Sequence, residues 1–497
     1  MEAARRLPVL SCAEAAAAEA AFIGTDKKLS WQLMRCASLG VAHEALTLLR
    51  RQPKRILILA GQGNNGADAF LAALYCAQPG TEMTVVFAGR RPIGAQALRA
   101  WSTKKRGVKI KYATAAKLPD LGRVKFCLIF DGIFGQGFHG PLSKDLGALL
   151  RNTEKLQGLR IAVDLPSGLG DDTRGPAFRA DLTVSIGCLK RPLLEPSARK
   201  FTGRIRVLDI GLPLGETEEV SATEETLAPL RQIRRADADK RHQGRVLIIG
   251  GSETMPGAVL MNTRAALQSG AGLVTTCLPR SLRNKAALAL PEAMWNPFAT
   301  GTSGYISADA LPSLRKSFPN KDVLLLGSGM GEKSAATLVK LVKRCDLSLV
   351  LDADALRPEI IQASAPTKIR VLLPHAGEFK RLSGHTMTPS AGRAYAKQTK
   401  TIVVLKGALT CVTDGVRTLH IPFGGPVLAR GGSGDLLAGM VASVLARRTE
   451  LKLTPLEAVE LAVVWQGCAA DILSRKQGEE AVRTTDLLSE LSSALLS

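Results

Sequence analysis

The sequence predicts an α/β protein with two doubly wound domains, each built around a largely parallel sheet. Short and nearly continuous apolar runs end in glycine or aspartate, which is typical of parallel strands buried on both faces. Helix-like segments separate these runs along the whole chain. A polar segment at 216–239 lacks a strand pattern, and it divides the 497 residues into predicted domains at 1–215 and 240–497.

The first domain contains six predicted strands: RILILA (55–60), MTVVFAG (83–89), KFCLIFDG (125–132), RIAVDLPSG (160–168), DLTVSIG (181–187) and GRIRVLDIG (203–211). Helical segments such as 66–78 and 144–156 lie between them. Ligands of an open parallel sheet bind beyond the carboxyl ends of its strands. The polar residues that follow these runs are therefore the candidate site residues.

The second domain repeats the alternation with six more predicted strands: GRVLIIGGS (244–252), GLVTTCLP (272–279), DVLLLGSGMG (322–331), LSLVLDADAL (347–356), KIRVLLPHAGEF (368–379) and TIVVLKGALTCVTDG (401–415). Helices predicted at 433–448 and 455–473 complete it.

The composition argues against several classes of protein. A net charge of +22 favours polyanions, including phosphorylated small molecules. The basic groups lack interleaved aromatic residues, so no specific nucleic-acid binding is expected. No apolar run approaches the roughly 20 residues of a membrane span, and Glu14 and Glu19 argue against a signal peptide. The nine cysteines are scattered without a CxxC pair, so we expect reduced cysteines in a cytoplasmic protein.

Polar residues follow three strands of the first domain. A glycine-rich turn after 55–60 starts a helix, where backbone N–H groups favour anions and asparagine side-chain oxygens suit a cation or a ribose. Aspartate and serine follow two further strands, so one crevice is predicted to collect Asn64, Asn65, Asp68, Asp131, Asp164 and Ser167. The alternative is that these residues are helix caps and turn residues.

A second glycine turn, GGSGDLLAG, begins the helix at 433–448. Gly431, Gly432 and Gly434 allow backbone N–H groups to converge on an anion at the helix N-terminus. Asp435 is placed to take a proton from a hydroxyl that attacks a phosphate. Other strand ends supply further polar residues: Lys406, Thr410, Asp352, Asp354, His375 and Glu378.

The ordered motifs GNNGAD, FDGIFGQGFHG, AVDLPSG and ADLTVSIGCLKRP resemble the N-terminal domain of the NAD(P)H-hydrate epimerases over most of residues 5–215. The resemblance implies a Rossmann-like fold with Asp68 and Asp164 as catalytic residues. It implies a potassium ion at Asn65, Asp131 and Ser167. It also implies that the hydrated dinucleotide contacts Asn64, Asn65, Gly66, Ala67, Asp68, Gly135, Gln136, Gly137, Phe138, His139, Gly140, Pro141 and Asp164. The family usually has NNGGDG, whereas Ala67 and Ala69 replace two of these glycines here.

The motifs GRVLIIGGSETMPGAVL, LLGSGMG, LDADAL, LPHAGEF, VVLKGALT and GGSGDLLAG resemble the ribokinase-like superfamily over roughly residues 240–490. Within it they resemble the ADP- or ATP-dependent NAD(P)H-hydrate dehydratases, which implies magnesium, ADP or ATP as co-substrate, and Asp435 as the catalytic base. The implied substrate contacts are Ala258, Gly329, His375 and Asp435. The implied nucleotide contacts are Lys406, Gly407, Ala408, Leu409, Thr410 and Gly434.

Together the two resemblances predict a fused enzyme that repairs hydrated NADH and NADPH, and they imply a homo-oligomer. One alternative is a ribokinase-like small-molecule kinase whose N-terminal nucleotide-binding domain is inactive or regulatory. Ala67 and Ala69 favour inactivity of that domain, since each adds a methyl group to the glycine turn. An oxidoreductase is disfavoured because no GxGxxG fingerprint follows a strand.

Overall fold

The chain divides into two sets of residues, and each set forms a compact unit with its own internal contacts. This computed structural model describes residues 5–88, 107–115, 118, 121–122, 124–215, 217–234, 236–237, 239–301 and 304–496. One set, which we call the amino-terminal unit, comprises Leu7–Ser221. The other, the carboxy-terminal unit, comprises Ala222–Ser497 together with Met1–Arg6. The chain passes from one unit to the other inside the polar segment 216–239.

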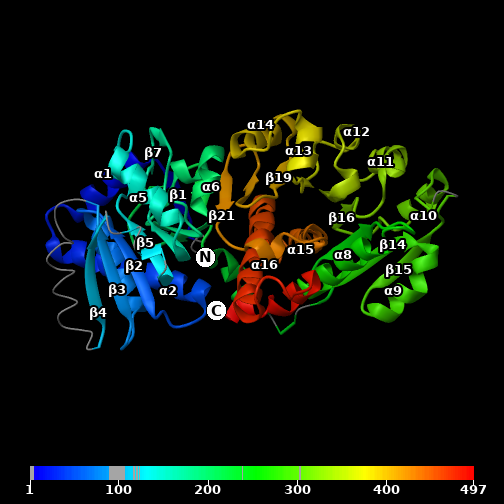
Figure 1. Ribbon diagram of the computed structural model, residues 1–497. Coiled ribbons are helices and arrows are strands. Elements are labelled where there is room, and N and C mark those ends of the chain that lie inside the picture. Colours follow the sequence, from blue (N-terminus) through cyan, green and yellow to red (C-terminus); the bar gives the residue numbers. More distant parts are fainter. Residues whose placement is uncertain are drawn as a thin grey trace. The chain divides into compact units, whose positions relative to one another are not determined.

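A seven-stranded parallel sheet forms the centre of the amino-terminal unit, with the order β11-β9-β6-β5-β2-β3-β4 (Figure 1). Its strands are β2 (Arg55–Ala60), β3 (Glu82–Phe87), β4 (Lys109–Thr114), β5 (Lys125–Gly132), β6 (Gln157–Val163), β9 (Leu182–Ile186) and β11 (Arg204–Leu208). All six strands expected from the sequence are present. Strand β4 was not expected, because this edge strand is largely exposed and has no buried apolar run. Gly89, at the end of the expected run 83–89, lies outside the described residues.

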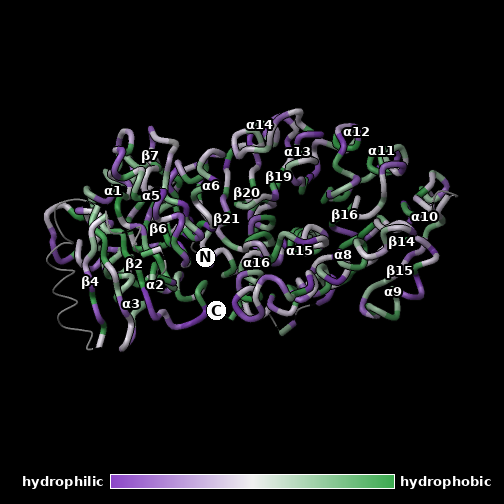
Figure 2. Tube along the Cα trace, in the orientation of Figure 1, coloured by the Kyte–Doolittle hydropathy of each residue, from purple (hydrophilic) through white to green (hydrophobic). Residues whose placement is uncertain are grey.

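Helices cover this sheet: α1 (Cys12–Ile23), α2 (Lys27–Leu49), α3 (Asn64–Cys76), α5 (Lys144–Glu154) and the short α6 (Arg199–Thr202). Helix α3 packs against α2 and against β2 and β5. Hydrophobic residues dominate along β2, where Ile56, Leu57, Ile58 and Leu59 are fully buried (Figure 2). Strand β2 leads into α3 through only Gly61–Gly63, so the first residues of α3 lie at the carboxyl edge of the sheet.

Short strands complete the amino-terminal unit. They are β1 (Leu7–Leu10), β7 (Leu169–Gly170), β8 (Thr173–Arg174), β10 (Leu189–Lys190) and β12 (Glu219–Ser221). Strand β1 pairs in parallel with β10 and antiparallel with β12. Strand β12 lies in the polar segment, where no strand was expected, because its three residues are too few to show an alternation.

The sheet of the carboxy-terminal unit has the order β21-β20-β19-β18-β17-β16-β13-β14-β15. Its strands are β13 (Arg245–Ile249), β14 (Leu273–Pro279), β15 (Met294–Phe298), β16 (Val323–Leu326), β17 (Ser348–Leu351), β18 (Arg370–Leu372), β19 (Ile402–Leu405), β20 (Thr410–Thr413) and β21 (Thr418–Ile421). Neighbouring strands are parallel from β15 at one edge through β14, β13, β16, β17 and β18 to β19. The pairs β19–β20 and β20–β21 are antiparallel. The segment 401–415, which was expected to form one strand, forms the two strands β19 and β20 with a turn between them. Strands β15 and β21 were not expected from the sequence.

Three helices of this unit position its site: α8 (Pro256–Gln268), α15 (Ser433–Ala446) and α16 (Pro455–Gln477). Helix α15 packs between α8 and α16 and over β13, β16 and β17 (Figure 1). The remaining helices are α7 (Ala228–Arg231), α9 (Arg283–Ala289), α10 (Leu311–Arg315), α11 (Ala335–Val342), α12 (Pro358–Ala363), α13 (Ala376–Ser383), α14 (Pro389–Thr399) and α17 (Ser493–Leu496). Within the described residues, every helix is too short or too polar to cross a lipid bilayer.

The beginning of the chain is bound to the carboxy-terminal unit by an ion pair. The Nη2 atom of Arg6 lies 2.7 Å from Oε2 of Glu460 on α16, and the Glu460 side chain is fully buried. Arg417 donates to both carboxylate oxygens of Glu460 at 3.1 Å. Two arginines therefore share one buried carboxylate.

We predict that each unit folds on its own when the chain is cut between Ser221 and Ala222, because each has its own sheet and hydrophobic core. The piece 222–497 lacks Arg6, and losing one hydrogen bond to a buried carboxylate costs roughly 1.5–3 kcal/mol of unfolding free energy. Chemical denaturation gives the unfolding free energy of the carboxy-terminal unit in the piece, in the unchanged full chain and in the full chain with the matched variant Arg6→Met. The difference from the unchanged chain measures this loss. An unfolded piece would show that the units depend on each other.

Candidate active sites

A cavity of about 640 Å³ lies at the carboxyl ends of β2, β5 and β6 in the amino-terminal unit. The turn after β2 and the first residues of α3 form one wall, and the loop after β5 forms another. Eight of the residues expected at this site line the cavity: Asn64, Asn65, Asp68, Gly135, Gln136, Gly137, Phe138 and Asp164. The three loops therefore converge, as the positions of their polar residues predict.

Asp164 is held firmly in an uncommon backbone conformation. Its φ is 69°, in the left-handed region that residues other than glycine rarely adopt. The Oδ1 atom accepts hydrogen bonds from Lys190 Nζ at 2.5 Å and from the Ile186 N–H at 3.2 Å. The Oδ2 atom accepts from the Gln136 N–H at 3.1 Å. These three donors fix the position of the side chain.

Asp131, Ser167 and Asn65, the expected ligands of a cation, form one network beneath the cavity. Asp131 is fully buried, and it accepts from Ser167 Oγ at 2.7 Å and from the Ser167 N–H at 2.8 Å. Ser167 Oγ accepts from the Phe134 N–H, and Asn65 donates to the Phe134 carbonyl oxygen. Burial raises the pKa of Asp131 to about 6. A cluster of carboxylate, hydroxyl, amide and carbonyl oxygens fits a hard monovalent cation, which would favour the ionised Asp131.

Two further carboxyl groups line the same cavity. Asp68 accepts from Ser38 Oγ at 3.2 Å, and burial raises the pKa of Asp68 well above its usual range. Glu19 on α1 accepts from Gln136 Nε2 at 2.5 Å, and burial, followed by the nearby Asp164, raises the pKa of Glu19. The neutral form of each group is therefore easier to populate than that of an exposed carboxyl group.

Five of the expected contact residues lie elsewhere. Gly66 and Ala67 are buried, and Ala67 belongs with Ala69 to the hydrophobic core under α3. His139 is exposed at the rim of its loop. The methyl groups of Ala67 and Ala69 thus lie in the core, so they do not narrow the cavity.

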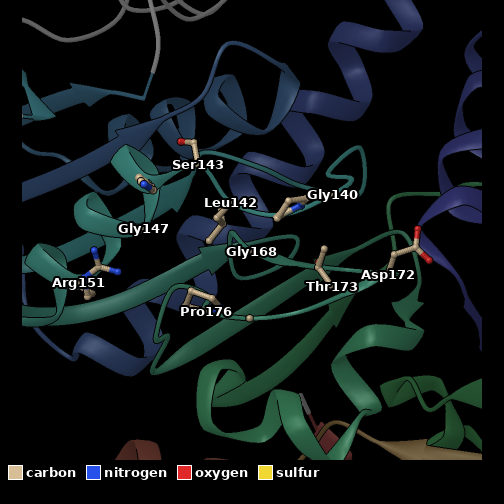
Figure 3. A pocket seen from close by; sticks show the side chains of 12 residues that line it. Gly140, Leu142, Ser143, Gly147, Arg151, Gly168, Asp172, Thr173 and Pro176 are labelled. Atoms are coloured by element: carbon tan, nitrogen blue, oxygen red, sulfur yellow. The ribbon is translucent and has the colours of Figure 1, made fainter.

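Gly140 and Pro141 line a second cavity of about 590 Å³ in the same unit (Figure 3). Ser143 at the start of α5 lies on one side of this cavity, and Arg151 of α5 and Asp172 lie at opposite ends of the view. These residues contribute nothing to the cavity that holds Asp164.

Lys190 and Glu19 are the cavity residues that sequence reasoning missed. Lys190 is 1% exposed although it carries a charge, and it also donates to the Ile186 carbonyl oxygen. Its place in the motif SIGCLKRP, directly after the buried Leu189, was the available signal. Glu19 interrupts an alanine run, which the sequence alone presents as the polar face of an amphipathic helix.

The second site surrounds the N-terminus of α15 in the carboxy-terminal unit. Lys406 Nζ donates to Asp352 Oδ1 at 2.8 Å. A Cβ atom added to Gly434 would lie 3.2 Å from Lys406 Nζ and 3.9 Å from Asp352 Oδ2, so this glycine lies directly against the ion pair. Burial lowers the pKa of Lys406, but the carboxylates of Asp352, Glu378 and Asp435 together outweigh burial, and the net shift is upward.

Asp435 lies in the first turn of α15. Burial, followed by the neighbouring Asp352 carboxylate, raises the pKa of Asp435 to about 6. Lys406 opposes this shift, and Glu378 adds to it, so all four charged groups face one another. A carboxyl group with such a pKa at a helix N-terminus can act as a base at neutral pH.

His375 lies beside Lys406, because these two residues form a parallel β-bridge. Its Nδ1 accepts from the Gly377 N–H at 3.0 Å as the cap of α13, and Glu378 accepts from the His375 N–H at 2.8 Å. The imidazole therefore has a fixed orientation, and its side chain is 61% exposed.

The other expected residues of this site form two groups. A Cβ atom on Gly329, whose φ is 68°, would lie 3.1 Å from Ala258 Cβ, so these two positions are neighbours. Lys406, Gly407, Ala408, Leu409 and Thr410 form the turn between β19 and β20, where Thr410 Oγ1 donates to the Gly407 carbonyl oxygen at 3.3 Å. Asn262 was missed: its side chain donates to the Asp435 carbonyl oxygen at 2.7 Å and holds the start of α15.

Two family models match the chain, one in each unit. Residues 246–493 match the model described as NAD(P)H-hydrate dehydratase. Residues 30–192 match the model described as YjeF-related protein N-terminus.

Similar proteins span nearly the whole chain. A bifunctional NAD(P)H-hydrate repair enzyme from Moorella thermoacetica is 33% identical over 88% of this chain and 86% of its own length. One from Pyrobaculum aerophilum is 33% identical over 92% of both chains. The solved structure of a ribokinase-like superfamily protein from Enterococcus faecalis covers 57% of this chain and 97% of its own, with 25% identity and a TM-score of 0.50.

Proposed function

The chain belongs to the family of bifunctional NAD(P)H-hydrate repair enzymes, and on this premise we propose that its two sites carry out consecutive steps of one repair. The amino-terminal unit interconverts the R and S epimers of hydrated NADH or NADPH. The carboxy-terminal unit dehydrates the S epimer with ADP or ATP. The observation that supports this assignment best is the pair of separate strand-end sites, one around Asp164 and one around Asp435.

In the dehydration, Asp435 accepts the proton of the ring hydroxyl while that oxygen attacks the terminal phosphorus of the nucleotide. Backbone N–H groups of the turn 431–434 and the ammonium of Lys406 stabilise charge on the transferred phosphoryl group. The lone pair of the ring nitrogen then expels phosphate, and loss of a proton from the neighbouring carbon restores the dihydronicotinamide. Magnesium, when bound, neutralises charge on the nucleotide phosphates, and the carboxylates of Asp352 and Glu378 fit such an ion.

In the epimerisation, Asn64 and the loop around Gln136 bind the dinucleotide, while Asp164 and Asp68 face the hydrated ring. Inversion at a carbon that bears a hydroxyl next to nitrogen requires a base and an acid close to the ring. The fixed Asp164 carboxylate fits the base, and Asp68, whose pKa is raised, fits the acid. Potassium, held by Asn65, Asp131 and Ser167, would fix the geometry of three loops.

Two further proposals concern the state of the protein in the cell. We propose a cytoplasmic location, supported by seven of nine cysteines being buried as thiols. We also propose a homo-oligomer, which size-exclusion chromatography with light scattering tests.

The test of the whole assignment is incubation of the purified protein with mixed R and S hydrates of NADH, magnesium, and ADP or ATP. We expect complete recovery of NADH absorbance with at least one nucleotide. Recovery of only the S fraction would reject an active epimerase, and no recovery would reject the dehydratase. A stable phosphorylated product would favour the small-molecule kinase.

The dehydratase rate should fall as pH is lowered through about 6, because Asp435 must be ionised to accept a proton and its pKa is about 6. Initial rates with purified S epimer from pH 5 to 8 measure this dependence. A rate that is constant down to pH 5 would contradict a base with this pKa.

Replacing potassium with N-methylglucamine should lower the epimerase rate and leave the dehydratase rate unchanged, if Asn65, Asp131 and Ser167 hold the ion. The Ser167→Ala variant removes one ligand and should raise the potassium concentration required for half-maximal epimerase activity. Identical potassium dependence in both proteins would exclude this site.

A further inference from the structure

Asp164 combines two unfavourable features. Its left-handed backbone conformation costs of order 1–3 kcal/mol, and such residues persist only where their surroundings fix them. Its side chain is also buried, at 6% exposure, which disfavours a carboxylate that lacks a partner. The contacts around Asp164 must offset both costs.

Lys190 is the charged donor among the three groups that donate hydrogen bonds to the Asp164 carboxylate. Its Nζ atom lies 2.5 Å from Asp164 Oδ1, whereas the other two donors to Asp164 are neutral backbone N–H groups. Among the described residues that line the cavity, Lys190 is the only cation. Burial lowers the pKa of Lys190, but Asp164, Cys188 and Glu19 together outweigh burial, so the net shift is upward and the ammonium form persists.

Three carboxyl groups line this cavity with that single cation: Glu19, Asp68 and Asp164. Glu19 and Asp68 each accept a hydrogen bond from a neutral donor, Gln136 and Ser38 respectively. Asp164 alone has the ammonium group. The cavity therefore holds one ion pair and two further carboxyl groups whose printed hydrogen bonds come from neutral side chains.

We propose that Lys190 is a positioning residue that selects Asp164, among the three carboxyl groups of the cavity, as the base of the epimerase. Glu19, joined to Asp164 through Gln136, is then a second candidate for the acid besides Asp68. This inference rests on the proposed epimerase function of the amino-terminal unit. Asp164 takes the proton of the ring hydroxyl as the bond between that carbon and the ring nitrogen breaks to give an aldehyde, and the acid protonates the nitrogen. After rotation, the nitrogen attacks the opposite face of the aldehyde, and both protons return to the groups that gave them, so the cycle needs no other reactant.

The matched variants are Lys190→Gln, which keeps a hydrogen-bond donor without charge, and Lys190→Arg, which keeps the charge. Epimerase rates are measured on the full chain with purified R epimer, nucleotide, magnesium and an excess of a separate S-specific dehydratase. We expect Lys190→Gln to lower kcat about 100-fold with KM within about threefold, and Lys190→Arg to keep kcat within about tenfold.

The pH profile separates the electrostatic role from a structural one. Without its cation, Asp164 is left with Glu19 and Cys12 from α1, Asp68 from α3, and Cys188 as its ionisable neighbours, so we expect the pH at which the epimerase rate is half-maximal to be higher in Lys190→Gln than in the wild type. A Lys190→Gln variant with normal kcat would overturn the proposal. Equal losses in both variants with an unchanged pH profile would show that Lys190 contributes only packing.

A double variant keeps the proposal testable if Lys190→Gln does not fold, because Asp164→Asn together with Lys190→Gln removes both charges. If Lys190 acts through Asp164, this protein is no slower than Asp164→Asn alone. A further loss of about 100-fold would overturn the proposal. The dehydratase activity of each variant reports folding of the other unit. Failure of the wild-type protein to exceed spontaneous epimerisation would instead reject the proposed function.

Discussion

The Asp435→Asn variant is expected to lose nucleotide-dependent dehydration by about 10²–10⁴-fold in kcat, while its nucleotide affinity stays within about tenfold of wild type. Asparagine keeps the shape of the side chain at the start of α15, and the Asn262 bond to the Asp435 carbonyl oxygen does not involve the side chain. The change therefore removes the base without removing the anion-binding turn.

Initial rates with purified S epimer and calorimetric titration of ADP and ATP measure these two quantities. Asp346→Asn is the matched control, since its carboxylate is 93% exposed in the same unit. Near-normal turnover in Asp435→Asn would reject Asp435 as the base. A parallel loss of nucleotide affinity would assign it a binding role instead.

The Asp164→Asn variant is expected to lower epimerisation by about 10²–10⁴-fold. Asparagine tolerates the left-handed backbone conformation better than alanine does, so this change retains the loop at φ 69° and removes only the charge. Dehydration of the S epimer is expected to be unchanged, because Asp435 lies in the other unit.

This result is measured with pure R epimer and an excess of separate S-specific dehydratase. Asp172→Asn is the control, since this exposed residue belongs to the second cavity of the same unit. An Asp164→Asn variant that matches wild type would show that the cavity lacks the chemistry assigned to it.

Much of the fold follows from the sequence because buried parallel strands have a distinct pattern. Runs such as Ile56–Leu59 are apolar at every position, so the strands of both sheets could be located. Strand β4 was missed because its exposed positions break that pattern. Strands β19 and β20 were read as one run, because the turn at Gly407–Leu409 carries no proline or asparagine.

Most of the predicted site residues of the amino-terminal unit lie at or just beyond the carboxyl end of a strand. Asn64, Asp131 and Asp164 meet because parallel strands end at one edge. Lys190 could not be found in this way, since its burial depends on an ion pair with a residue 26 positions away. The inward direction of the Ala67 methyl group depends on how α3 packs on the sheet, which residue order alone does not give.

The ion pair between Arg6 and Glu460 joins residues 454 positions apart, and this separation has a consequence for biosynthesis. Ribosomes add about 5–20 residues per second, so Arg6 waits on the order of a minute before Glu460 is made. The amino-terminal unit can meanwhile fold on the ribosome, whereas the carboxy-terminal unit can be completed only after the last helices have emerged. A nascent chain that stalls before α16 has been made would therefore carry a folded amino-terminal unit, while Arg6 would still lack its ion pair with Glu460. Accessibility of the beginning of the chain to protease would report how far translation has advanced.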